Sequence, residues 1–240
     1  MKIEKIYEFL NALSPFELQE EWDNSGLVAG SMQSEAESIC VCLDLSLKTV
    51  LKADKNTLFI THHPLVFKSL KKFDYSRYPS SILKAAMEKE CAIIAMHTNI
   101  DKTHLNRFAL EEILGFKTLK SEGFISYFET DKSFNELALH VKEKLKIAAI
   151  KVVPTDKRIK KAAFCAGSGG DLLGGVEADC FISGDFKYHH AIEAKENNIA
   201  LIDAGHFESE RYFPHMLSKY LKNFPLKAII TDCKNPFEYK

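Results

Sequence analysis

The residues of this chain that could do chemistry are histidines and carboxylates that follow apolar runs. They are His62 and His63 after TLFIT, His97 and Asp101 after CAIIAM, and His206, Glu208 and Glu210 after IALIDAG. Imidazole and carboxylate donors suit Zn, Fe(II), Mn or Co, and the lack of a nearby cysteine argues against a structural cysteine-type zinc site. In open α/β sheets, sites form beyond the carboxyl ends of strands, so these segments could meet in one crevice. A chance surface pair at His62 and a core histidine at His97 are the competing interpretations, and the residues alone leave both open.

The adjacent pair His62 and His63 bears on how many ions such a site would hold. Neighbouring side chains on a strand point to opposite faces, and Pro64 keeps His63 in an extended conformation. The two imidazoles therefore diverge, which suits two ions about 3.5–4 Å apart better than a single ion. We predict a dinuclear site with one of these histidines on each ion.

The segment GHFESER places His206 and Glu210 at an i, i+4 spacing. This spacing puts both side chains on one face if a helix begins at His206. Pro214 lacks the N–H that would bond to residue 210, which opposes one helix running through all three residues. The alternative is a turn that carries the ligands, with Pro214 early in a following helix.

Composition limits the classes of protein. The chain has 240 residues and is 46% hydrophobic, which suits one large domain or two small ones. Its 32 basic residues balance 33 acidic ones, so charge indicates neither a nucleic-acid nor a membrane-surface binder. The six cysteines form no C-x-x-C pair and are expected as buried free thiols of a reducing compartment. No signal peptide opens the chain, and no run approaches the ~18 apolar residues of a membrane span, so we expect a cytoplasmic protein.

Apolar periodicity predicts an alternation of helices and strands in the first half. We expect helices over 2–13, 14–21, 46–54, 80–90 and 103–115, and strands over 38–45, 57–63 and 91–98. Asp23, Asn24 and Gly26 are expected to form a turn. The alternation predicts a largely parallel sheet that helices cover on both faces.

The second half is less regular. We expect strands over 124–129, 148–153, 161–166, 180–183, 199–203 and 226–232, and helices over 134–145, 188–197 and 213–223. The predicted fold class is α/β, with two lobes of mostly parallel or mixed sheets flanked by helices and the metal site between them. The N-terminal lobe is placed at 1–122 and the second lobe at 123–240, and the last strand, 226–232, could return to the first lobe.

The glycine-rich segment CAGSGGDLLG follows the apolar run KKAAFCA. Backbone amides of such a loop, around Gly167, Gly169 and Gly170, can approach an anion. The pattern is neither a Walker A nor a G-x-G-x-x-G sequence. Close packing of a strand against a helix is therefore the favoured interpretation.

Six phrases of the sequence together resemble one known family. They are EEWDNSGLVAG, THHPLVF, HTNID, CAGSGGDLL, ISGDFKYHHA and DAGHFESER, in this order. They resemble the Ngg-interacting-factor-three-like family, whose bacterial members are often labelled GTP cyclohydrolase 1 type 2 homologues. The resemblance runs from about Trp22 to Pro236, and THHPL is specific in combination with GHxxSE. It implies a toroidal homohexamer with metal sites that face an internal cavity.

The resemblance also implies a set of ligands for two divalent metal ions, which could be Zn, Fe, Mn or similar. Carried over position by position, these ligands are His62, His63, Asp101, His206 and Glu210, with Glu210 bridging the ions. His97 matches a motif histidine near the site, either supporting the metal ligands or facing substrate. His189 matches a motif histidine after ISGD, which favours a pocket role over a plain helix surface. His97 and His189 are the candidate catalytic proton carriers.

Two functions are consistent with this pattern. The first is a metal-dependent hydrolase in which two ions activate a bridging water and hydroxide attacks C8 of a purine nucleotide, as in GTP cyclohydrolase chemistry. Another small molecule with a phosphoester or amide bond would use the same centre. The second is a non-catalytic, metal-stabilised ring that binds a protein or nucleic-acid partner. A ligand set rich in histidine and carboxylate, with coordination positions left open, favours the enzyme.

Overall fold

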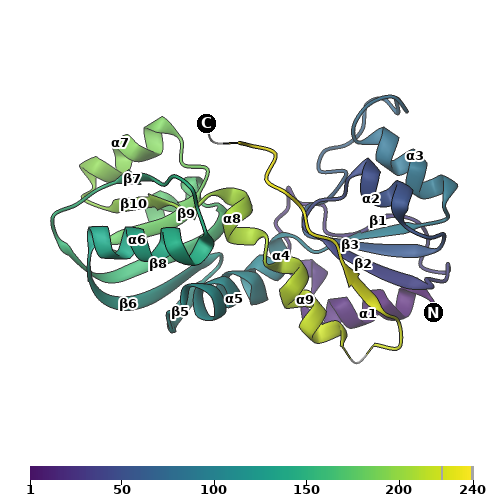
Figure 1. Ribbon diagram of the computed structural model, residues 1–240, viewed down its shortest axis with the longest axis horizontal. Coiled ribbons are helices and arrows are strands. Elements are labelled where there is room, and N and C mark those ends of the chain that lie inside the picture. The colour runs from purple at the N-terminus through teal and green to yellow at the C-terminus, as the bar shows by residue number, and fades with distance from the viewer. Residues whose placement is uncertain (223, 239–240) are drawn as a thin grey trace. The chain divides into compact units, whose positions relative to one another are not determined.

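The computed structural model describes residues 1–222 and 224–238 (Figure 1). The chain divides into two compact units, each with its own sheet. The first unit comprises Met1–Ile100 and Phe213–Cys233, and the second comprises Asp101–Tyr212 and the segment that begins at Lys234. Both sheets are mixed and carry helices, which confirms the α/β fold class.

The boundary between the units lies after Ile100, whereas the sequence suggested 122. The reason is the helical segment that follows Asp101. Its residues Ala109, Leu110 and Leu114 are fully buried in a core cluster with Phe128 of the second sheet. The segment therefore belongs to the second unit through its packing, although it follows the strands of the first along the chain.

The sheet of the first unit has the order β1-β4-β3-β2-β11. Its strands are β1 (Gly26–Ala29), β2 (Ser38–Cys42), β3 (Thr57–Thr61), β4 (Ala92–Ala95) and β11 (Ala228–Ile230). Strands β2, β3, β4 and β11 run parallel, and β1 pairs antiparallel with β4. All five residues of β3 are buried, as expected of a strand with both faces covered.

Helices cover both faces of this sheet. They are α1 (Ile3–Leu13), η1 (Phe16–Leu18), α2 (Leu47–Lys52), α3 (Ser80–Glu88), α4 (Thr98–Ile100) and α9 (Phe213–Leu221). Phe59 packs in one cluster with Val50 of α2 and Ile82 of α3. Leu58 and Ile60 alternate with Phe59 along β3, so they point to the other face, on which α1 and α9 lie (Figure 1).

Two features of the first unit differ from what the sequence predicted, and a third settles which sheet the last strand joins. Gly26–Ala29 is the strand β1, because the segment after the expected turn pairs with β4. The helix expected through Glu21 is only the short turn η1. The last strand, β11, pairs with β2 and therefore joins the first unit. The expected end of the preceding helix at Asn223 lies outside the described residues.

The sheet of the second unit has the order β5-β6-β8-β9-β10-β7. Its strands are β5 (Thr118–Glu122), β6 (Ile125–Ser133), β7 (Lys151–Val153), β8 (Arg158–Ser168), β9 (Cys180–Gly184) and β10 (Ala200–Asp203). Strands β8, β9 and β10 run parallel to one another, and the remaining pairs are antiparallel. The carboxyl ends of β9 and β10 therefore lie at the same edge of the sheet.

Helices also lie on both faces of the second sheet (Figure 1). They are η2 (Asp101–Leu105), α5 (Asn106–Phe108), η3 (Ala109–Leu114), α6 (Phe134–Leu145), η4 (Gly170–Gly175), α7 (Tyr188–Glu196) and α8 (His206–Glu210). Phe164 of β8 packs with Leu137 of α6. The next residue, Cys165, packs on the opposite face with Leu173 of η4 and Ala194 of α7.

All six cysteines are free, and five of them are buried. Among the described residues, none of the helices combines the length and the apolar character needed to span a bilayer.

Candidate metal centre

Three histidines of the first unit come together at one edge of its sheet. His62 and His63 directly follow β3, and His97 follows β4. Because β3 and β4 are neighbouring parallel strands, their carboxyl ends lie side by side. The three residues offer ring nitrogens that all lie within 4.8 Å of one another. The three histidines that the sequence placed after apolar runs therefore do lie together at one edge of the sheet.

Each of these histidines is held by a hydrogen bond from its Nδ1 atom. His62 is fully buried, and its Nδ1 donates to the carbonyl of Met96 at 2.9 Å. Nδ1 of His63 donates to Asp44 at 2.8 Å. In a neutral imidazole, a proton on Nδ1 leaves the lone pair on Nε2. Histidine ligands of metals commonly have this arrangement, in which a carbonyl or carboxylate fixes the tautomer and the direction of the ring.

His97 is held by Asp23 at an Nδ1–Oδ1 distance of 2.8 Å. The Asp23 side chain is inaccessible to solvent and also accepts hydrogen bonds from the amide and hydroxyl of Thr98. Burial acts to raise the pKa of Asp23, but the bonds from His97 and Thr98 outweigh it and hold the pKa well below its usual range. Asp23 is therefore an ionised carboxylate that orients His97. The sequence indicated only a turn here.

In the second unit, His206 and Glu210 lie on one face of the short helix α8. This helix follows β10 through Gly205, and the His206 Nε2 atom is 3.0 Å from the Glu210 carboxylate. The i, i+4 interpretation is correct because α8 ends at Glu210. Pro214 lies in the separate helix α9 and does not interrupt it.

Electrostatics around His206 favour its protonated form. Its Nδ1 atom bonds to Asp185 at 2.7 Å, and Asp185 directly follows β9. Burial acts to lower the pKa of His206, but the hydrogen bonds to Asp185 and Glu210 outweigh it and raise the pKa to about 11. The positive charge of the His206 imidazolium therefore offsets part of the negative charge of Asp185 and Glu210.

Gly167, at the end of β8, makes room for Glu210. Its φ of 68° lies in the left-handed region, and a Cβ atom there would collide with the Glu210 carboxylate. Gly169 packs against Ser183 and Gly170 against His190 in the same way. The segment CAGSGGDLLG forms the end of β8 and most of η4, and its glycines allow close packing against helices, as the sequence favoured.

Asp101 is a buried carboxylate at the start of η2, a π-helical segment. Such segments are frequent at functional sites. The side chain of Asn106 donates to the Asp101 carbonyl and accepts from the Ala166 amide, which ties this segment to β8. Burial raises the pKa of the Cys165 thiol, and the charges of Asp101 and Glu210 raise it further. Both carboxylates are therefore close enough to Cys165 of β8 for their charges to affect its pKa.

His189 and Glu208 have different surroundings from those of the candidate ligands. His189 is exposed on α7, where its ring stands edge-on to Tyr188 at 5.4 Å. Among the described residues it belongs to none of the groups that could hold a metal ion. Its neighbour His190 is the packed member of the pair, against Gly170 and 3.3 Å from Asp171. Glu208 accepts a hydrogen bond from Asn235 at 2.7 Å.

Sequence reasoning missed three carboxylates that orient histidines. They are Asp23, Asp44 and Asp185. Asp44 and Asp185 could have been found, because each follows a buried strand just as the histidines do. Asp23 could not, because its segment DNSGL has the composition of an ordinary turn.

The donor set fits a metal ion of the kind that binds nitrogen and oxygen. Imidazole and carboxylate groups suit Zn, Fe, Mn and Co. The fixed tautomers of His62 and His63 and the glycine beneath Glu210 are features of the protein that suit such a ligand role. The fold and these side chains thus define an α/β protein with histidine and carboxylate groups that could hold a metal ion.

Residues 1–236 match the family described as Duf34/NIF3 (NGG1p interacting factor 3), and the chain belongs to this family. The resemblance noted in the sequence is therefore confirmed. A GTP cyclohydrolase 1 type 2 homolog of Campylobacter jejuni is 50% identical over 240 residues and 100% of both chains. A GTP cyclohydrolase 1 type 2 of Helicobacter pylori is 42% identical over 238 residues and 98% of both chains.

A solved structure supports the fold. A hypothetical protein of Staphylococcus aureus matches with a TM-score of 0.88 over 100% of this chain and 99% of its own, at 24% identity. At this identity, the likeness concerns the arrangement of helices and strands alone.

Proposed function

We propose that this protein is a metal-dependent hydrolase that acts on a purine nucleotide or a related small molecule. Its two divalent ions would be held by His62, His63, Asp101, His206 and Glu210. The names of the Campylobacter and Helicobacter relatives suggest a ring opening of the GTP cyclohydrolase kind. The observation that carries the proposal is the adjacent pair His62 and His63, whose Nδ1 atoms are fixed by hydrogen bonds, because this arrangement prepares Nε2 for a metal.

Two of the proposed ligands lie, along the sequence, close to the points where the chain changes from one unit to the other. Asp101 follows His97 by about one helical turn, at the point where the chain enters the second unit. Glu210 lies just before α9, and the ring of Phe213 in α9 is 5.0 Å from that of His62. Asp101 and Glu210 therefore lie within a few residues, along the chain, of His97 and Phe213 of the first unit.

Bound divalent ions would lower the pKa of a water molecule and polarise the substrate. The protein's own part is proton transfer and orientation. His97 is the better placed of the two candidate proton carriers, because it lies beside His62 and His63 and is oriented by the ionised Asp23. A histidine with a carboxylate on Nδ1 presents Nε2 as the basic atom. The exposed position of His189 does not support the same role.

The test combines metal analysis with a substrate screen. The purified protein is reconstituted with Mn, Zn or Fe, and GTP, other nucleotides and simple phosphoesters are screened for products by chromatography. We expect turnover of a nucleotide and more than about 100-fold loss of turnover in Glu210→Ala, with loss of bound metal by elemental analysis. Glu196→Ala, an exposed carboxylate at the end of α7, is the matched control.

A different result would favour the non-catalytic alternative, a metal-stabilised homohexameric ring. In that case every substrate stays inert, and Glu210→Ala both loses metal and dissociates the assembly as measured by light scattering. Turnover that survives complete removal of metal would contradict the proposed function directly.

A further inference from the structure

Two exposed aromatic rings stand beside the histidines of the first unit. Trp22 is 58% exposed and Phe67 is 42% exposed, and their ring centroids are 5.7 Å apart. Both also lie edge-on to His97, at 6.2 and 6.0 Å. His97 in turn contacts His62 and His63, at 5.1 and 5.5 Å. The pair Trp22 and Phe67, here called the aromatic wall, is therefore continuous with the histidine cluster.

The backbone that carries this wall is firmly held. The side chain of Asn24 donates to the carbonyl of Val66 at 2.6 Å, which joins the segment of Trp22 to that of Phe67. Asp23 is bound by His97 and Thr98. A large aromatic residue left in solvent on a turn that is held by hydrogen bonds is typical of a binding surface, because aromatic area stays available at little entropic cost.

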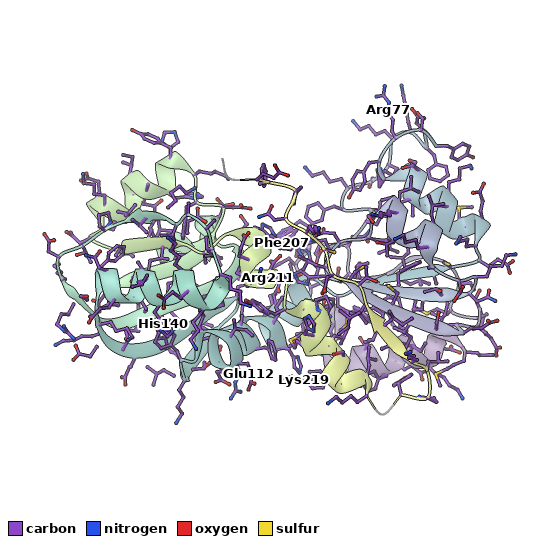
Figure 2. All side chains as sticks on the ribbon, viewed as in Figure 1. Arg77, Glu112, His140, Phe207, Arg211 and Lys219 are labelled. Carbon is purple, nitrogen blue, oxygen red and sulfur yellow. The ribbon has the colours of Figure 1, made fainter. Side chains whose placement is uncertain are left out.

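Cationic residues follow the aromatic wall along the chain. The loop from Phe67 to α3 contains four basic residues and one acidic residue, namely Lys68, Lys71, Lys72, Arg77 and Asp74. All five are exposed, and the acidic one is engaged by Arg77 and Ser76. Figure 2 shows Arg77 on this loop, which projects beyond the end of α3. The loop thus combines aromatic area with net positive charge.

We propose that the aromatic wall stacks the base of a nucleoside phosphate and that Lys68 and Lys71 contact its phosphate groups. Every base has a π face that stacks on aromatic side chains, and lysine is a common point-charge partner of phosphate. The choice of a nucleotide rests on the proposed function and names how that substrate is bound. Trp22 and Phe67 would place the base against His97, the proposed proton carrier.

A second macromolecule is the less favoured occupant of this surface. Cores of protein–protein interfaces are depleted of lysine, whereas this loop is rich in it. The balanced charge of the whole chain also opposes a long nucleic acid. A small ligand with an aromatic ring and phosphates matches both properties of the loop.

Trp22 is the only tryptophan of the chain, so its fluorescence reports on the wall directly. The full-length protein, loaded with Zn or treated with chelator, is titrated with GTP, guanosine and inorganic triphosphate. We expect saturable quenching by GTP in both forms and weaker binding of guanosine. Triphosphate alone should compete with GTP without the same quenching. The absence of any GTP-dependent change, together with absence of GTP binding in equilibrium dialysis, would overturn the inference.

Variants separate the stacking surface from the charged loop. Phe67→Ala and Trp22→Ala, measured by dialysis, should bind GTP at least about fivefold more weakly. Trp22→Phe keeps an aromatic face and should retain most of the affinity. If Trp22→Ala does not fold, Phe67→Ala and Trp22→Phe still test the stacking surface. Lys68→Ala with Lys71→Ala should weaken GTP but not guanosine. Tyr75→Ala, an exposed aromatic on the same loop, should leave binding unchanged.

The outcomes distinguish this inference from the proposed function. If GTP binds and quenches Trp22 but no nucleotide turns over, the hydrolase proposal fails and the stacking site stands. If GTP turns over with the same KM in Phe67→Ala and wild type, and Trp22→Ala binds it normally, the stacking site is wrong. Tighter binding of a single-stranded oligonucleotide than of GTP would also overturn it.

Discussion

The two units carry different kinds of candidate ligand, and they hold them differently. In the first unit, three imidazoles stand at the ends of neighbouring buried strands, and each is oriented by a hydrogen bond from Nδ1. In the second unit, two carboxylates and one imidazole lie on short helical segments, and Glu210 and His206 lie against Gly167 near the end of β8. Strand ends and hydrogen bonds position the three histidines of the first unit. In the second unit, a glycine without a side chain leaves the room that the Glu210 carboxylate occupies.

The hydrogen-bond partners of His62 and His206 also differ in charge. His62, in the first cluster, is a fully buried ring held by a main-chain carbonyl. In the second cluster, the His206 imidazolium lies between Asp185 and Glu210. A metal ion arriving at the second cluster would therefore displace a proton, because a ligand histidine must be neutral. Variants in matched positions of the two units can test this contrast.

The largest effect is expected for Gly167→Ala. Its Cβ would push the Glu210 carboxylate away, so we expect loss of bound metal as well as strain of about 1–3 kcal/mol from the positive φ. Gly115→Ala is the control, because its φ is 78° and a Cβ there meets no atom within 4 Å. Elemental analysis and urea unfolding measure the two effects. Equal metal content in both variants would show that the space at Gly167 does not determine the position of the Glu210 carboxylate.

Next in size are the carboxylates that orient histidines. Asp185→Asn should weaken metal binding about 10- to 100-fold, because Asp185 fixes the proposed ligand His206. Competition with a chromogenic chelator measures this affinity.

Asp23→Asn should instead lower kcat by about 100-fold while metal content stays unchanged, because Asp23 orients His97. The comparison uses the substrate found in the screen and circular dichroism as the control for folding. A loss of metal in Asp23→Asn would instead place His97 among the ligands.

The smallest effect concerns the helix caps of the two units. Ser133 caps α6 in a capping box with Glu136, whereas Ser46 caps α2 with Thr49 and no acidic residue. Hydrogen bonds from Ser133 lower the pKa of Glu136 below its ordinary value of about 4.3. The stability from this box is therefore complete above pH ~4.3 and is lost as pH falls through the lowered pKa.

Unfolding measured between pH 7 and pH 3 tests this difference. The deficit of Ser133→Ala should shrink in acid, whereas Ser46→Ala should cost about 1 kcal/mol at every pH. A pH-independent deficit in both variants would show that Glu136 takes no part in the cap.

The sequence predicted most of the strands that place the histidines, because buried parallel strands read as continuous apolar runs. TLFIT and CAIIAM located His62, His63 and His97 at the correct edge of the first sheet. The i, i+4 spacing of His206 and Glu210 was equally informative, because a short helix suffices to bring such residues together.

Other features depend on tertiary packing and could not be predicted. From sequence, Gly26–Ala29 has the pattern of the end of a turn, and only its pairing with β4 makes it a strand. Similarly, only the surroundings of Gly170 show that His190, and not His189, is the packed member of its pair. The division after Ile100 follows from side-chain burial along a helical stretch whose local pattern is uninterrupted.

The pairing of β11 with β2 has a practical consequence for work with this protein. This last strand forms the outer border of the first sheet, with Ile229 opposite Cys40. A polypeptide that stopped before Ala228 would leave the main-chain amides and carbonyls of β2 without their neighbour. Uncovered strand borders recruit other chains. Shortened versions of the protein should therefore precipitate before they lose their remaining secondary structure.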